Sequence, residues 1–106
     1  MKKLKIYRHG DLLIIPVELI PKGLSPKKDT VLLEGEASNH FHRLGGGTVF
    51  KEEPTINNNF LLGYFDIPTE TPLTHEEHKT IILPPGKYKF MSQREYDPQA
   101  NRRVID

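Results

Sequence analysis

The apolar segments of this chain are short, and turn residues separate them at fairly regular intervals. Nine prolines and eight glycines among 106 residues supply many of those turns. This pattern interrupts long helices, whereas it is typical of sandwiches and barrels built from short strands. We therefore predict an all-β domain, a small barrel or sandwich of about seven to nine short strands with at most one short helical turn.

The length fits one domain, residues 1–106, because folded domains commonly span roughly 100–150 residues. Hydrophobic residues make up 36% and charged residues 27% of the chain, which is typical of globular rather than disordered proteins. Residues 93–106 are polar, and we interpret them as a C-terminal extension of the same domain.

Charge and cysteine content narrow the possible functions. The formal net charge is +1, whereas proteins that neutralise many phosphates usually carry a clear basic excess, so no strong nucleic-acid signal is present. The chain has no cysteine, which excludes disulfides and thiolate metal sites. Any bound metal ion must therefore be held by histidine nitrogens and carboxylate oxygens.

The N-terminal segment begins with basic residues but lacks the uninterrupted apolar stretch of a signal peptide. Arg8 and Asp11 interrupt it early, and Pro16 and Glu18 break the apolar run that follows. No run approaches the roughly 20 apolar residues that span a bilayer. We expect a cytoplasmic protein without a membrane partner.

Eight segments have the composition and alternation of strands. They are residues 3–8, 11–19, 30–36, 39–44, 48–53, 60–67, 78–84 and 87–92. The segment 60–67 is apolar on both faces, so we predict that it is the most buried central strand. In the last strand Tyr88 and Phe90 alternate with Lys87 and Lys89, which predicts one inward and one outward face.

Four of the five histidines lie in two close pairs, the first of which is in a predicted strand. Side chains two residues apart share a face of a strand. His40 and His42 then point the same way, with Glu36 on that face and Phe41 on the opposite, apolar face. This arrangement requires that the chain does not bend between Glu36 and His40.

The second pair lies in "LTHEEH", the best helix-start signal of the chain. Thr74 followed three residues later by Glu77 is a capping-box pattern. A strand would send His75 and His78 to opposite faces, whereas a helical or tight turn would bring them together. The capping box favours the turn.

The two pairs predict one divalent-metal site if they meet in the fold. Its candidate ligands are His40, His42, His75 and His78. Imidazole and carboxylate donors suit Zn²⁺, Mn²⁺, Fe²⁺ or Ni²⁺. Glu36 or Glu77 would be a further ligand or a general base, as in a metal-dependent hydrolase. The opposing interpretation is that these histidines belong to solvated polar faces.

Two other functions remain open, each with its own partners. Paired histidines and glutamates suit metal-free acid–base cleavage of RNA or a cyclic nucleotide, with Arg94 or Lys89 holding the phosphate. A non-enzymatic binding module, or a homo-oligomer, would instead use exposed sheet edges. We interpret the fifth histidine, His9, as a turn residue, because Gly10 beside it tolerates unusual backbone angles.

The stretch "GEASNHFH" looks like the first half of a cupin metal motif, and "LPPGKY" resembles the P-x-G turn of the second half. The resemblance implies a double-stranded β-helix barrel in which His40 and His42 hold a metal ion. The chain departs from the motif in lacking a glutamate four or five positions after His42, and Lys89 stands where the last histidine ligand is expected. Most of the chain is also similar to small bacterial and phage proteins of uncharacterised activity.

Overall fold

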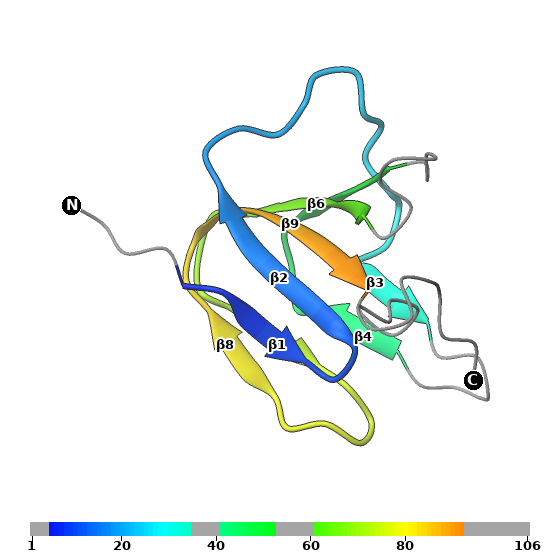
Figure 1. Ribbon diagram of the computed structural model, residues 1–106, viewed down its shortest axis with the longest axis vertical. Coiled ribbons are helices and arrows are strands. Elements are labelled where there is room, and N and C mark those ends of the chain that lie inside the picture. The colour runs from blue at the N-terminus through cyan, green and yellow to red at the C-terminus, as the bar shows by residue number, and fades with distance from the viewer. Residues whose placement is uncertain (1–4, 35–40, 53–60, 93–106) are drawn as a thin grey trace, which may run out of the picture.

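The computed structural model describes residues 5–34, 41–52 and 61–92, and it contains nine strands and no helix within these ranges (Figure 1). The strands are β1 (Tyr7–His9), β2 (Leu12–Val17), β3 (Val31–Glu34), β4 (Phe41–Leu44), β5 (Thr48–Lys51), β6 (Leu61–Ile67), β7 (Thr71–Thr74), β8 (Ile81–Leu83) and β9 (Gly86–Ser92). The prediction of an all-β fold is confirmed. The predicted extension 93–106 lies outside the described residues.

The strands form two antiparallel sheets. One has five strands in the order β1-β2-β9-β6-β5, and the other has four in the order β3-β4-β7-β8. Each sheet keeps two edge strands among the described residues, so of the two predicted architectures, barrel or sandwich, the sandwich is the one that fits. No helix in the described part of the chain is long and apolar enough to cross a membrane.

The hydrophobic core draws on both sheets. Its buried members are Leu12, Ile14, Val49, Phe65, Ile67, Tyr88 and Phe90 from the five-stranded sheet, and Leu32, Leu44, Leu73 and Leu83 from the four-stranded sheet. Because a strand alternates between two faces, each sheet turns one apolar face toward this common cluster. The Phe65 ring packs between those of Tyr88 and Phe90, with centroid distances of 5.0 and 6.0 Å.

The prediction that segment 60–67 is the most buried central strand is confirmed in part, because β6 is an interior strand but β9 is the central one of its sheet. β6 lies between β9 and β5, and every second residue from Leu61 to Ile67 is buried while the intervening ones are half-buried. The inward face of β9 carries Tyr88 and Phe90, as its alternation predicts.

β7 is a strand that the sequence patterns do not predict. A proline within a four-residue run argues against a strand, because proline cannot donate a ladder hydrogen bond. In β7, Thr71 and Leu73 are nevertheless buried, while Pro72 and Thr74 are exposed. The carbonyl of Pro72 also accepts a hydrogen bond from the Gly45 N–H at 2.8 Å. This strand decides where the second histidine pair lies.

Candidate metal centre

His42 occupies the inward face of β4. It is 5% exposed, and Leu44 two residues later is also buried, while Arg43 between them is exposed. The prediction that His42 and Phe41 face opposite sides is confirmed, but the predicted core side is wrong. β3 and β4 are separate antiparallel strands, and Glu36 and His40, the other members of the predicted polar face, lie outside the described residues. His42 therefore lies at the edge of the core.

The β4–β7 register brings the two histidine segments together. Arg43 pairs with Thr74, and in antiparallel strands the next positions along the ladder are His42 and His75. One position further, the Phe41 N–H donates a hydrogen bond of 2.8 Å to Oε1 of Glu76. The end of β7 is thus attached to the start of β4, and the His75 ring lies with its centroid 4.4 Å from that of His42.

His75 and His78 meet through a bend, not through a helical turn. Nδ1 of His75 accepts the backbone N–H groups of Glu77 at 3.0 Å and of His78 at 3.3 Å. The predicted cap, Thr74, instead donates from its hydroxyl to the Arg43 carbonyl at 3.3 Å. The capping-box prediction of a helical turn is therefore wrong, because the strand pairing of β7 holds Thr74. The prediction that a tight turn joins the two histidines is confirmed by ring centroids 4.4 Å apart.

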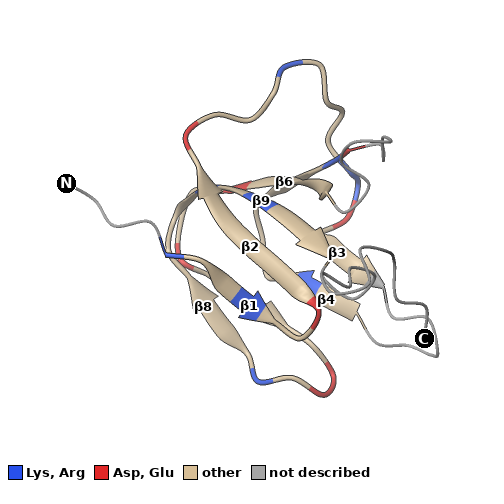
Figure 2. Cartoon of the chain, in the orientation of Figure 1, with Lys and Arg blue, Asp and Glu red and all other residues tan. Residues whose placement is uncertain are grey.

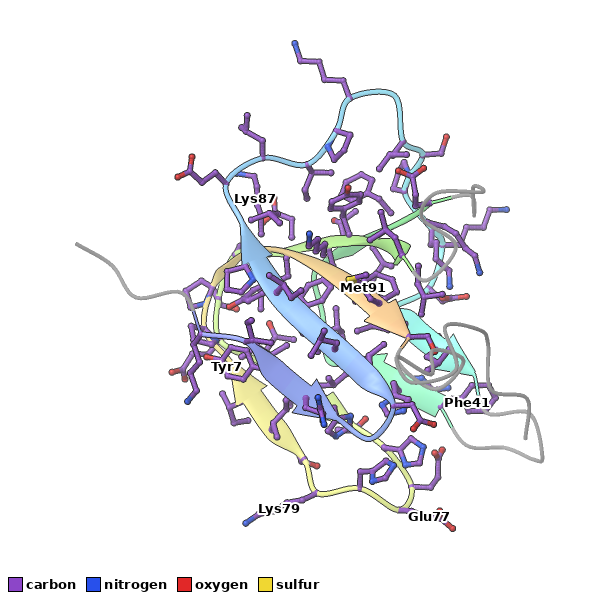
Figure 3. All side chains as sticks on the ribbon, in the orientation of Figure 1. Tyr7, Phe41, Glu77, Lys79, Lys87 and Met91 are labelled. Carbon is purple, nitrogen blue, oxygen red and sulfur yellow. The ribbon has the colours of Figure 1, made fainter. Side chains whose placement is uncertain are left out.

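Three imidazoles converge from these two segments. One ring nitrogen from each of His42, His75 and His78 lies within 4.8 Å of the other two. His42 is buried, His75 is half-buried and His78 is exposed, so the group opens to solvent on the side of the β7–β8 loop. That loop, which carries Glu77 and Lys79 in Figure 3, approaches the β1–β2 turn, where a Cβ atom at Gly10 would touch His78 and His42.

The fifth histidine, His9, belongs to this cluster and was missed by the sequence interpretation. It is the last residue of β1, 3% exposed, and its ring centroid lies 4.9 Å from that of His42. The turn that follows contains only Gly10 and Asp11, because His9 pairs with Leu12. Two residues of the type Gly-Asp between alternating segments are a hairpin signal. Reading the hairpin this way places His9 on the core side, beside Leu12.

Gly10 makes room for the cluster. Its φ is 62°, a left-handed value that suits the first position of a two-residue hairpin turn. A Cβ atom at this position would lie 2.5 Å from Nε2 of His78 and 3.2 Å from Cε1 of His42. A glycine is therefore needed here for the backbone angle and for the two imidazoles.

The environment of the two buried rings disfavours their charged form. Burial lowers the pKa of His42 to about 3, with repulsion from the other three histidines adding to it and the charge of Glu76 opposing it. Burial also lowers the pKa of His9, against the effect of its hydrogen bond to the Lys79 carbonyl. Neutral imidazole is the form that binds metal ions. Figure 2 shows acidic segments in the β1–β2 turn and in the β7–β8 loop.

The other predicted site residues have different outcomes. Glu36, His40 and Arg94 lie outside the described residues, and their roles stay predictions. Glu77 is exposed, and Figure 3 shows its side chain pointing outward from the tip of the β7–β8 loop. Glu76, which the sequence interpretation did not select, is the glutamate whose charge acts on His42.

The geometry fits a three-histidine metal site after a small contraction. Nitrogens bound tetrahedrally to Zn²⁺ at about 2.0–2.1 Å lie roughly 3.4 Å apart. The three ligand atoms lie within 4.8 Å of one another, so the side chains must draw together to reach that spacing. His75 and His78 are on the bend and the more exposed, so the adjustment falls to them rather than to buried His42.

Residues 8–93 match the model of one family, described as a domain of unknown function, DUF8820. The chain belongs to this family. No curated protein and no solved structure matches the chain. The matched part of this DUF8820 domain contains all five histidines. The description of the matched family names no cupin, and the two open sheets differ from a cupin barrel, so the cupin resemblance is not confirmed.

The stability of the metal-free DUF8820 domain should fall as the pH drops below about 6.5, the usual histidine value. The folded-state pKa values of His42 and His9 are lowered, so the unfolded chain binds more protons in this range. Each histidine contributes a slope of up to about 1.4 kcal/mol per pH unit, and that of His42 continues toward pH 3. Urea unfolding in chelator between pH 7.5 and 5 measures the slope, which His42→Gln should reduce. A flat profile would contradict buried neutral rings.

Proposed function

We propose that this domain binds a divalent transition-metal ion through His42, His75 and His78. The observation that carries the proposal is the convergence of three ring nitrogens, from two segments more than 30 residues apart, within 4.8 Å of one another. Histidines that only cover a solvated polar face would not need to bring their ring nitrogens this close together. Imidazole donors without thiolates favour Zn²⁺, Fe²⁺, Ni²⁺ or Cu²⁺, with Mn²⁺ a weaker fit.

The composition of the site resembles that of catalytic metal centres. Structural zinc sites usually have four protein ligands, whereas catalytic ones have three and keep a position for water or substrate. The exposed side of the cluster, at His78, provides access to that position. An ion held here would supply Lewis acidity for hydrolysis. We therefore propose a metal-dependent hydrolase as the activity, with a small molecule or nucleotide as the substrate.

The bend at residues 75–78 is the part of the site that adjusts to the ion. In the metal-free protein, Nδ1 of His75 uses its lone pair to accept the N–H groups of Glu77 and His78. Coordination through Nδ1 takes the lone pair that accepts these two N–H groups, and coordination through Nε2 moves the ring proton to Nδ1, which can then no longer accept them. Either route moves the bend, while the register of β4 and β7 holds its N-terminal end in place.

Metal analysis and thermal melts of untagged protein test the proposal. After Zn²⁺ or Ni²⁺ loading and desalting, we expect close to one ion per chain. A free ion concentration of 100 times the Kd stabilises the folded state by about 2.7 kcal/mol, which is roughly 10 °C for a domain of this size. Chelator should reverse the shift. Neither bound ion nor a shift with any of the metals would contradict the proposal.

The metal-free acid–base enzyme is the second candidate, and the same rings would serve it. A general base works best when its pKa is near the working pH, and the pKa of His42 is lowered to about 3. His42 is therefore better suited to ligation than to proton transfer. Turnover of cyclic nucleotides or oligonucleotides in chelator, lost in His78→Ala, would favour this candidate. Absence of both metal and turnover would favour a binding module.

A further inference from the structure

Two of the clustered histidines form a hydrogen-bonded pair in the interior. Nδ1 of His9 and Nδ1 of His42 are 2.8 Å apart, and the two rings meet nearly edge to face at 74°. His9 is not one of the three residues whose ring nitrogens meet the metal-site spacing. Any contribution of His9 to the metal site therefore acts through its hydrogen bond to His42.

The partners of His9 determine where the ring protons are. Nε2 of His9 lies 2.9 Å from the Lys79 carbonyl oxygen, which can only accept, so Nε2 carries a proton. A neutral imidazole carries one proton and one lone pair on its two ring nitrogens. Nδ1 of His9 is then an acceptor, and the donor in the pair is the Nδ1–H of His42.

The consequence for His42 is a single available ligand atom. With Nδ1 protonated and the ring neutral, the lone pair is on Nε2, at the other end of the imidazole from His9. Metal-binding histidines generally donate their second ring N–H to a fixed acceptor, which sets both the tautomer and the ring orientation. That acceptor is usually a carboxylate, carbonyl or water, whereas here it is a second imidazole fixed by a main-chain carbonyl.

We infer that His9 is a positioning residue of the metal centre, which holds His42 as the Nδ1–H tautomer and so presents Nε2 to the ion. This inference rests on the proposed function. His9 also connects the two ligand-bearing segments, because it contacts β4 through Nδ1 and the β7–β8 loop through Nε2. Lys79 directly follows His78, so the same hydrogen bond restrains the loop next to a ligand.

The tautomers can be measured without any metal ion. Long-range ¹H–¹⁵N correlation spectra of the chelator-treated wild-type protein distinguish the two neutral forms of each histidine. We expect the Nδ1–H form for His42 and the Nε2–H form for His9. A His42 ring protonated at Nε2 would overturn the inference, whether or not the protein binds metal.

Two variants of His9 test its effect on the ion. His9→Leu has similar bulk but no polar atom, whereas His9→Asn keeps an acceptor oxygen near the position of Nδ1. We expect His9→Leu to weaken Zn²⁺ binding by about 10–100-fold, the usual effect of losing such a partner. His9→Asn should recover part of that loss and retain the Nδ1–H form of His42.

The comparison separates positioning from stability. If His9 only stabilised the fold, His9→Leu would lower the melting temperature of the metal-free protein and leave the Kd for Zn²⁺ unchanged, which would overturn the inference. Failure of wild-type protein to bind any metal would instead overturn the proposed function, and this inference with it. If His9→Leu does not fold, His9→Asn and the wild-type tautomers decide the question.

Discussion

His42→Ala is expected to weaken Zn²⁺ binding by about 100-fold or more. Structural zinc sites of zinc-finger peptides have binding free energies of about 10–16 kcal/mol, and a loss of about 2.8 kcal/mol lowers the affinity 100-fold. Removing one of the three ligands is expected to cost more binding free energy than this. Competition titration with a chromophoric chelator measures the Kd, and far-ultraviolet circular dichroism reports whether the variant is folded.

Arg43→Ala is the matched control. Arg43 is the next residue of β4, but it is exposed on the opposite face, with its guanidinium 5.2 Å from the centre of the Phe41 ring. It should leave the Kd unchanged. His78→Ala supplies a second ligand deletion at an exposed position, where folding is not at risk. If both histidine variants bind Zn²⁺ within about threefold of wild type, the three-histidine site is wrong.

The same titration on His40→Ala tests the sequence prediction that His40 is also a ligand. The described cluster reaches three ligands without it. A loss of affinity as large as that of His42→Ala would add His40 as a fourth ligand. An unchanged affinity would leave an open coordination position, which the hydrolytic proposal requires.

Much of the fold follows from short-range patterns. The apolar composition of β6, the alternation in β9 and the frequent turn residues correctly indicate a strand-rich architecture. β7 was not predicted, because Pro72 lowers the local strand preference. Pairing with β4 and β8, together with burial of Leu73, outweighs that preference. Tertiary contacts of this kind are not encoded in a window of a few residues.

The sequence predicted that histidines form the site, but it identified only some of the histidines that do. Spacing selected His42, His75 and His78, which do converge. Their proximity depends on the β4–β7 register, and that register could not be deduced once β7 was missing. The predicted first strand ended one residue too early, so His9 was assigned to the turn, whereas it is the last residue of β1. A two-residue Gly-Asp hairpin would have placed it correctly, although nothing in the sequence links it to His42.

Gly10→Ala should weaken Zn²⁺ binding by about 10-fold or more, while changing the free energy of unfolding only modestly. A loss of about 1.4 kcal/mol of binding free energy is sufficient for a 10-fold higher Kd. The new Cβ would lie 2.5 Å from Nε2 and 2.8 Å from Cδ2 of His78. These atoms are at the far end of an exposed side chain, so the ring can move away at little cost to the fold. The movement displaces a ligand, and the cost therefore appears in the Kd for Zn²⁺.

Gly23→Ala separates this effect from backbone strain. Gly23 also has a positive φ, 91°, but a Cβ there would have no heavy atom within 4 Å. Left-handed geometry costs a non-glycine residue roughly 1–2 kcal/mol, so both variants should lose a similar amount of unfolding free energy in chelator. Only Gly10→Ala should lose metal affinity, because only its methyl group reaches the imidazoles. Equal Kd values for the two variants would mean that His78 is not held at the ion as the structure indicates.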